Sequence, residues 1–259
     1  MKTGLYIITH KEVKNIYPKD RNIMMVGAEN KNVPDGYCTD FDLQKENISS
    51  KNKNYCELTG LYFMTRHNNS DILSLEHYRR LFIKTRVYLF RYPFFRVRDI
   101  EKIFKTYDII LPKMAYHDKS IYEEYSDKHY GSDLDKIREI LLESYPSYVD
   151  GFDRCMSGNS TFLFNMFIAK RDIVVDYAKW LFDVLFKLEQ QIDISERDAY
   201  QQRVFGFLSE RLLTVYIMSH KDIRVKEARV QMVEGSAFMS QVKRVCNKIK
   251  KIFHLNKGE

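Results

Sequence analysis

Residues 47–82, NISSKNKNYCELTGLYFMTRHNNSDILSLEHYRRLF, form the stretch of sequence that decides the fold. After a polar start, apolar residues recur at positions 55, 58, 61, 62 and 63, which is the spacing of an amphipathic helix. An apolar strand at 71–75 (DILSL) then leads directly into Glu76-His77-Tyr78-Arg79-Arg80. A strand that only fills a core more often ends in turn residues. Because open α/β sheets bind ligands at the carboxyl ends of their strands, this segment predicts a functional site.

The composition is that of a globular protein with one large domain or two small ones. The chain has 259 residues, of which 44% are hydrophobic and 14% aromatic, so a fully disordered protein is excluded. Glycine (10) and proline (5) are scarce, which argues against a turn-rich β-sandwich. The four cysteines are far apart and form no CxxC pair. We therefore expect reduced thiols, without a zinc site or a disulfide framework.

Charge and hydropathy bear on location and partners. The N-terminus has only a short apolar run, and no segment approaches the roughly 18 apolar residues of a membrane span. We expect a soluble or peripheral, cytoplasmic protein. The net charge of +7 fits either an ordinary basic surface or an anionic partner such as nucleotide phosphate, anionic lipid or nucleic acid.

Periodicity along the rest of the chain predicts alternating strands and helices. Strands are expected at 4–9 (GLYIIT), 21–27 (RNIMMVG), 71–75, 108–111 (DIIL) and 162–168 (FLFNMFI), and helices at 99–106, 133–143, 172–188 and 201–218. Residues 86–98 (RVYLFRYPFFRVR) are expected to form an inserted loop or hairpin, and residues 116–130 a loop or lid. This order predicts an α/β sheet flanked by helices, with functional residues at strand tips.

The chain is expected to divide into a domain at 1–220 and an extension at 221–259. In the extension, residues 237–255 (AFMSQVKRVCNKIKKIFHL) place apolar and basic side chains on opposite faces of a helix. A basic amphipathic helix of this kind binds anionic membrane. A helix docked on its own domain with its lysines outward fits the pattern equally well.

A sugar nucleotide is the ligand that best fits the candidate site residues. It needs cations for its pyrophosphate and a base for the acceptor hydroxyl. Arg79 and Arg80 match phosphate geometry, with surface ion pairs as the alternative. His77 could bind phosphate, orient the sugar, act as the base or be structural. Glu210 could be a base or an acceptor ligand, or form an ion pair with Arg203 on the same helix face.

Other polar residues have weaker signals. Glu57 on its helix suggests a buried polar role, and Asn165 interrupts an apolar strand, where hydrogen bonding is the simplest function. Asp40-Phe41-Asp42 is a literal DXD that could bind Mg²⁺, but it lies in a polar loop, and we do not expect a metal there. GxGxxG, Walker, HExxH and GxSxG motifs are all missing from the sequence, which weakens the corresponding enzyme classes.

At these residues the chain resembles the DUF4422 family of bacterial capsular and exopolysaccharide glycosyltransferases. The resemblance covers about residues 4–218. Its blocks are Thr9-His10-Lys11, Asn47-Ile48-Ser49 with Lys51-Asn52, Tyr55-Cys56-Glu57-Leu58-Thr59 with Tyr62, His77-Tyr78-Arg79-Arg80, His129-Tyr130 with Asp133-Leu134, Tyr145-Pro146, Asn165-Met166-Phe167-Ile168, Trp180-Leu181-Phe182 and 203–212 (RVFGFLSERL). A departure is Leu73-Ser74-Leu75-Glu76, where the family usually has a glycine.

The resemblance implies a GT-A-like open sheet flanked by helices and a transferase that uses UDP-linked galactose, in its pyranose or furanose form. The acceptor would be a lipid-linked oligosaccharide of capsule, exopolysaccharide or O-antigen, at the inner face of the cytoplasmic membrane. The basic C-terminal helix would hold the enzyme there. No cofactor would be required, because the cations of residues 77–80 would replace the metal of ordinary GT-A enzymes.

The resemblance also implies roles for individual residues. Glu210 and His77 would be catalytic. The donor nucleotide would contact Thr9, His10, Lys11, Asn47, Ser49, Lys51, Asn52, Glu57, Tyr78, Arg79 and Arg80. The acceptor or the transferred sugar would contact His129, Asn165, Arg203 and Arg211.

A different class of function stays open at this point. A non-catalytic basic α/β module could hold nucleic acid or another polyanion, with bases stacking on the aromatic side chains of residues 86–98. The sequence has no RNP, KH or helix-turn-helix signature. The enzyme, which would bind no nucleic acid, is therefore the preferred interpretation.

Overall fold

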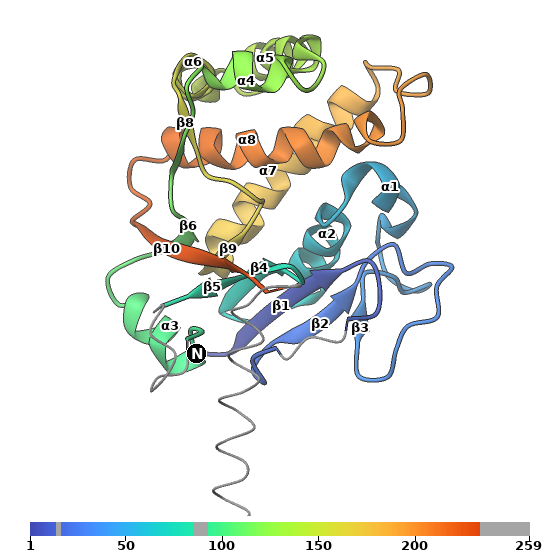
Figure 1. Ribbon diagram of the computed structural model, residues 1–259, viewed down its shortest axis with the longest axis vertical. Coiled ribbons are helices and arrows are strands. Elements are labelled where there is room, and N and C mark those ends of the chain that lie inside the picture. Colours follow the sequence, from blue (N-terminus) through green and yellow to red (C-terminus); the bar gives the residue numbers. More distant parts are fainter. Residues whose placement is uncertain (14–16, 85–92, 234–259) are drawn as a thin grey trace, which may run out of the picture.

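Most of the described strands belong to one large sheet. A computed structural model describes residues 1–13, 17–84 and 93–233 (Figure 1). Within them, eight strands follow the order β3-β2-β1-β4-β5-β10-β6-β9. Their bounds are β1 Thr3–Thr9, β2 Asn22–Met25, β3 Cys38–Thr39, β4 Ile72–His77, β5 Arg80–Ile83, β6 Ile109–Pro112, β9 Phe167–Lys170 and β10 Val225–Met232. The short strands β7 (Ala115–Tyr116) and β8 (Ser160–Thr161) pair separately.

The first half of the sheet is parallel. β1 pairs in parallel with β2 on one side and with β4 on the other, and β2 continues to β3. In this register Thr9 lies beside Met25, and Ile8 lies beside His77. The carboxyl ends of β1, β2 and β4 therefore lie at the same edge of the sheet.

The second half of the sheet closes on itself. After β4 the chain reverses over two residues into β5, with His77 paired to Arg80. β5 pairs with β10, β10 with β6, β6 with β9, and β9 with the amino-terminal part of β4. The pairings thus return to β4, the strand shared by both halves.

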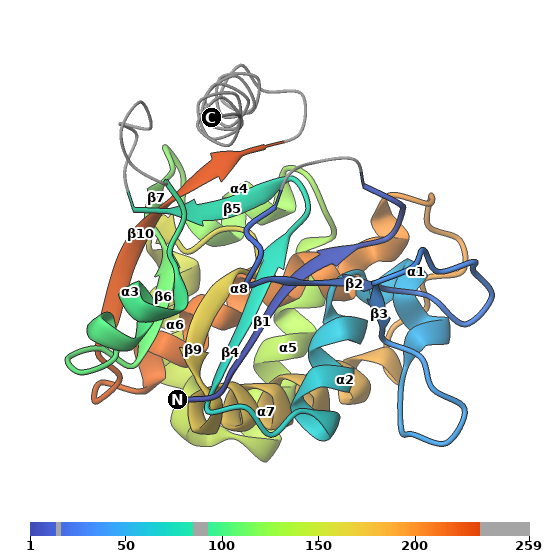
Figure 2. The same ribbon diagram turned by 90° about the horizontal axis from the view of Figure 1, so that it is seen from below.

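Helices cover both faces of the sheet (Figures 1 and 2). One face packs against α2 (Leu58–His67), α7 (Arg171–Glu189) and α8 (Val204–Ser219), with α1 (Asn52–Tyr55) beside α8. The helices α4 (Ile121–Ser126), α5 (Gly131–Ser144) and α6 (Val149–Ser157) lie beyond α8 in an outer layer. α3 (Val97–Ile103) covers the opposite face, where Ile100 packs with Leu5 and Ile168. Strand alternation explains the two cores, because Ile72 faces α3 whereas Leu73 faces the large helical core.

Most predicted elements are confirmed, but several details differ, and neither α6 nor β5 was predicted. Residues 116–130 contain α4, which begins with a capping box between Ser120 and Glu123. The predicted strand at 162–168 instead turns at Phe164 and Asn165, whose φ angles are +79° and +40°, before β9 begins. The helix predicted after residue 55 is divided by Cys56, at φ +52°. β10, which the sequence analysis placed in the extension, is a strand of the large sheet.

Two predicted segments lie largely or wholly outside the residues that the structure describes. Most of the 86–98 insertion and the whole basic helix at 237–255 belong to residues that the structure does not describe. Among the described residues, none of the helices has the length and apolar character needed to cross a bilayer.

Candidate functional site

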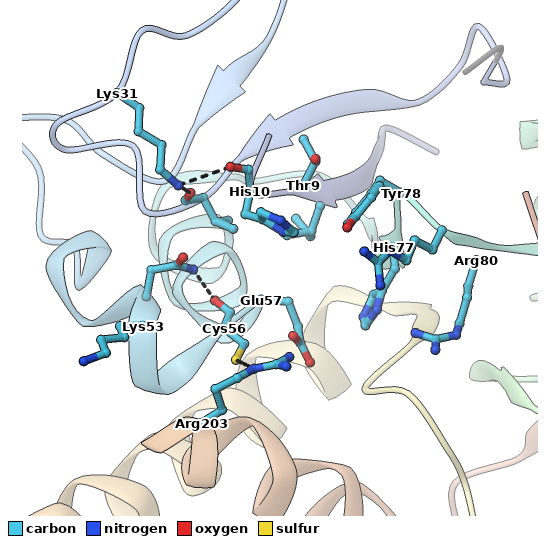
Figure 3. A pocket seen from close by; sticks show the side chains of 14 residues that line it. Thr9, His10, Lys31, Lys53, Cys56, Glu57, His77, Tyr78, Arg80 and Arg203 are labelled. Atoms are coloured by element: carbon cyan, nitrogen blue, oxygen red, sulfur yellow. Dashed lines mark hydrogen bonds between the residues drawn. The ribbon is translucent and has the colours of Figure 1, made fainter. Parts of the chain in front are cut away.

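A cavity of about 480 Å³ lies at the carboxyl edge of β1, β2 and β4 (Figure 3). Its walls also include the α1–α2 region and the residue before α8. The lining residues are Ile8, Thr9, His10, Val26, Lys31, Asn52, Lys53, Cys56, Glu57, His77, Tyr78, Arg79, Arg80 and Arg203. Among these described residues, five lysine or arginine side chains face a single carboxylate, so the cavity has a strongly positive lining.

The tip of β1 forms one wall. Thr9 is buried, and its hydroxyl donates to the carbonyl of Lys11 at 2.7 Å, which turns the chain after the strand. The His10 ring meets Tyr78 edge-on at 5.4 Å between ring centroids. Burial, together with the nearby charge of Lys31, lowers the pKa of His10. His10 is thus a predominantly neutral ring at the cavity wall.

The turn between β4 and β5 supplies the cations that the sequence predicted. The Arg80 guanidinium lies 4.2 Å from the Phe164 ring centroid, and Arg79 lies 5.1 Å from that of Tyr78. Three buried polar atoms of this turn have no hydrogen-bond partner within the described chain: His77 Nε2, Tyr78 Oη and Arg80 Nε. Because buried polar groups normally find partners, these atoms are available to a bound ligand.

His77 is held neutral by its surroundings. Burial lowers the pKa of its imidazole to about 3, and the positive charge of Arg80 acts in the same direction. A ring with this pKa is unprotonated throughout the neutral range. It is therefore suited to hydrogen bonding, and poorly suited to accepting a proton.

Cys56, Glu57 and Arg203 line the cavity at the break between α1 and α2. The carbonyl of Cys56 accepts a hydrogen bond from Asn52 Nδ2 at 2.6 Å, which holds the unusual backbone at Cys56. The Cys56 thiol in turn lies 3.3 Å from Arg203 Nε, which donates to it. Glu57 follows immediately and begins α2. The break therefore positions both Glu57 and Arg203.

The carboxyl group of Glu57 lines the cavity, and that of Glu210 lies close to Glu57. Asn165 Nδ2 donates to Glu57 Oε1 at 2.8 Å and to Ser209 Oγ at 2.6 Å. Burial raises the pKa of Glu57, although the Asn165 hydrogen bond acts against it. Burial also raises the pKa of Glu210 to about 7, with the charge of Glu57 contributing. Glu210 does not line the cavity itself, but it is close enough to Glu57 and Arg80 to feel both charges.

Several residues that were predicted to contact the donor nucleotide interact with other parts of the protein instead. Asn47 Nδ2 donates to the carbonyls of Asp42 and Lys45. Ser49 is buried and donates to Asp40 Oδ1 at 2.7 Å. Lys51 pairs with Glu189 at 2.6 Å, and Lys11 lies over the Tyr78 ring at 5.2 Å. None of Asn47, Ser49, Lys51 and Lys11 lines the cavity.

The predicted acceptor contacts are divided between the cavity and its surroundings. Arg203 is at the cavity wall, and Asn165 lies behind Glu57. Arg211 is buried and pairs with Glu124 at 2.8 Å. His129 stacks on Phe207 at 4.2 Å and does not reach the cavity.

Five lining residues were not predicted from the sequence: the apolar residues Ile8 and Val26, and Lys31, Lys53 and Cys56. Lys31 reaches the site because its Nζ donates to the carbonyl of Val26 at 3.0 Å. Lys53 and Cys56 lie inside the stretch singled out for its helical pattern, but only their neighbours were chosen. No sequence pattern marked the backbone break at Cys56.

Both aspartates of the DXD sequence, Asp40 and Asp42, interact with other groups of the protein. Asp40 is fully buried, and its carboxylate accepts from the backbone N–H groups of Gly27 and Ala28 and from Ser49. Asp42 is partly exposed and pairs with Lys45 at 2.9 Å. Among the described residues, no group of three or more His, Cys, Asp or Glu side chains is placed to hold a metal ion.

Comparisons with known proteins agree with this architecture. Residues 4–221 match the sequence profile described as "Domain of unknown function (DUF4422)". The chain belongs to the DUF4422 family. This DUF4422 protein is also similar to a solved structure described as a WbbM bifunctional glycosyltransferase in its apo form, with 27% identity and a TM-score of 0.78. The similarity covers 91% of this chain but only 46% of the other, so the chain spans about half of that protein. No curated protein matches the sequence.

Proposed function

We propose that this DUF4422 protein is a glycosyltransferase that uses UDP-linked galactose, in its pyranose or furanose form. The acceptor is a lipid-linked oligosaccharide in capsule, exopolysaccharide or O-antigen biosynthesis. One observation carries the proposal: five cationic side chains and one carboxylate line a cavity at the carboxyl edge of a parallel sheet. A nucleoside diphosphate sugar combines the negative charge and the hydroxyl groups that this lining complements. The similarity to a glycosyltransferase structure supports the same reaction class.

In this mechanism the turn between β4 and β5 binds the pyrophosphate. Arg79 and Arg80 donate to phosphate oxygens and stabilise the charge that develops on the leaving UDP. Lys31 and Arg203 add positive charge from the opposite walls. His77 is neutral, and it forms a hydrogen bond with the UDP-sugar without changing its own charge.

Glu210 is the base for the acceptor hydroxyl. Its pKa of about 7 lets the carboxylate exist at neutral pH and still accept a proton during transfer. Glu57 remains near the anomeric centre, where its negative charge stabilises the oxocarbenium-like transition state. Asn165 holds Glu57 in place by donating a hydrogen bond to its Oε1.

The remaining parts of the proposal concern setting and cofactors. The enzyme acts at the cytoplasmic face of the inner membrane, held there by the basic sequence at 237–255. No metal is required, because the cationic side chains carry the charge of the leaving group.

A binding measurement tests the proposal against the nucleic-acid alternative. Thermal unfolding is followed with UDP, UDP-galactose and a single-stranded oligonucleotide, each over a range of concentrations. UDP and UDP-galactose should raise the melting temperature, since a ligand at 100 times its Kd stabilises the native state by about 2.7 kcal/mol. Stabilisation by the oligonucleotide alone would overturn the proposal. A mass-spectrometric screen of UDP-sugars with a lipid-linked acceptor then identifies the product.

A further inference from the structure

An aromatic cluster lies next to Arg203, which lines the cavity. The ring centroids of His129 and Phe207 are 4.2 Å apart with an interplanar angle of 27°. Tyr200 stacks on His129 at 5.8 Å and contacts Phe207 at 4.9 Å. The Tyr200 residue is 54% exposed. We call Tyr200, His129 and Phe207 the aromatic platform.

Arg203 joins the aromatic platform to the cavity. Its guanidinium carbon lies 5.3 Å from the Phe207 ring centroid and 6.0 Å from that of Tyr200. The same side chain lines the cavity and donates to Cys56. A ligand that leaves the cavity past Arg203 therefore meets the platform next.

Helical spacing links the platform to the proposed base. Arg203 immediately precedes α8, and Phe207 and Glu210 lie four and seven positions further along. Residues spaced by three and four positions share one face of a helix. One face of α8 thus presents the cavity cation, a platform ring and the carboxyl group of Glu210 in succession.

The platform is held rigid by the surrounding loops. Asp198 Oδ1 accepts from the backbone N–H groups of Tyr200 and Gln201 at 2.8 and 2.9 Å. Gln201 Oε1 accepts a hydrogen bond from His129 Nδ1 at 3.0 Å, and Gln201 Nε2 donates to the carbonyl of Lys128 at 2.8 Å. These bonds tie the α7–α8 loop to the segment between α4 and α5. A preformed surface loses little conformational entropy when it binds a ligand.

We propose that the aromatic platform is the acceptor subsite, which stacks the terminal hexopyranose ring of the acceptor glycan; this rests on the proposed transferase function. One face of a hexopyranose carries mainly C–H groups, which pack against an aromatic face, while its hydroxyls remain free for polar neighbours. Arg203 supplies such a polar group at the edge of the platform. The stacked sugar has a hydroxyl directed along α8 toward Glu210, where the base removes its proton.

Substitution of Tyr200 separates acceptor binding from donor binding. Tyr200→Ala should raise the acceptor KM about tenfold, the size expected for loss of one aromatic stacking contact, and leave the KM for UDP-sugar unchanged. Tyr200→Phe keeps the ring and should behave like the unmodified protein. Tyr116→Ala removes a tyrosine that is 78% exposed on β7, away from the platform, and serves as the surface control.

A second measurement does not depend on transfer. Saturation-transfer NMR with methyl β-galactopyranoside and methyl α-glucopyranoside should show contact between the protein and the ring C–H protons of at least one of them. Tyr200→Ala should abolish this contact, and Tyr116→Ala should retain it. Equal NMR signals in the unmodified protein, Tyr200→Ala and Tyr116→Ala would contradict the acceptor-subsite proposal. A Tyr200→Ala variant whose KM values for donor and acceptor change together would also contradict it. Lack of transfer with every UDP-sugar would instead contradict the proposed function and leave the NMR result to decide the subsite.

Discussion

At the scale of single residues, Glu210 determines the expected pH dependence. Its pKa of about 7 means that the carboxyl group is largely protonated below neutral pH and cannot then act as a base. The value of kcat/KM should therefore rise with pH up to about 7 and level off above it. Glu210→Gln should lower kcat roughly 10²- to 10⁴-fold and abolish this rise. Steady-state rates between pH 5 and 9 provide the measurement.

The stability of the same variant is a control for folding. A carboxyl group whose pKa is raised from 4.5 in the unfolded chain to about 7 in the native state destabilises the native state as pH rises through that interval. Glu210→Gln removes this effect, so it should unfold at a higher temperature than the unmodified protein at pH 8. A variant that loses both activity and stability at pH 8 would point to a structural role for Glu210.

Arg79 tests the pyrophosphate contact. It belongs to the turn between β4 and β5, and its exposed position lets it be removed without disturbing the core. Arg79→Ala should abolish detectable transfer and weaken UDP binding by about 10- to 100-fold, the range for a hydrogen bond to a charged group. Calorimetric titration with UDP measures the change. Arg154→Ala, an exposed arginine on α6 outside the cavity, is the matched control. An unfolded Arg79→Ala variant would show that the side chain is structural.

The residues that the sequence predicted best are those beside a strong local pattern. His77–Arg80 end an apolar strand, which is itself a signal, and they do line the cavity. Lys31 lies in a polar loop, and only its hydrogen bond to Val26 brings it to the site. Such a contact depends on tertiary structure, so the sequence contained no pattern from which to predict it.

At the scale of elements, the hydrophobic pattern of the sequence predicted several helices and strands that the structure confirms. The helix at 172–188 is α7, and the strands at 4–9 and 108–111 are β1 and β6. β10 was missed because half of its residues, VKEARVQM, are polar and only Ala228 is buried. Pairing with β5 and β6 fixes it in the sheet. The apolar run at 162–168 was misassigned, since its hydrophobicity reflects burial and not extended structure.

Gly27 lies just after β2 and packs against Asn52 in the cavity wall. It has φ +61°, and a Cβ added there would lie 2.7 Å from Asn52 Oδ1. Gly27→Ala should therefore destabilise the protein by roughly 2–4 kcal/mol, through backbone strain and overpacking together. It should also weaken UDP binding, because Asn52 lines the cavity and holds the Cys56 carbonyl. Urea unfolding and calorimetric titration measure the two effects.

Gly36 is the matched control for that substitution. Its φ is +81°, but a Cβ there would meet nothing within 4 Å. Gly36→Ala should cost only the backbone strain, about 1–2 kcal/mol, and should leave UDP binding unchanged. Equal effects of the two alanines on binding would show that Asn52 is not displaced.

At the scale of the whole molecule, the site is assembled from distant parts of the chain. Arg203 and Cys56 are in contact although they are 147 positions apart. β4 belongs to both halves of the sheet, so its carboxyl end is fixed by parallel neighbours on one side and by the closed circuit of strands on the other. The sequence predicted the two halves of the site separately. Their meeting depends on the contact between α1 and α8, which is a property of the complete fold.

The charge of the whole cavity leads to the expectation that transfer is independent of metal ions. Lys31, Lys53, Arg79, Arg80 and Arg203 line the cavity with Glu57, and guanidinium groups bind phosphate oxygens directly. The DXD carboxylate of Asp40 already accepts three hydrogen bonds from its own loop. Transfer from UDP-galactose should therefore continue at its full rate in excess EDTA, and adding Mn²⁺ or Mg²⁺ should give no increase. Complete loss of activity in EDTA, with recovery on adding either ion, would show that the cationic side chains do not replace a metal.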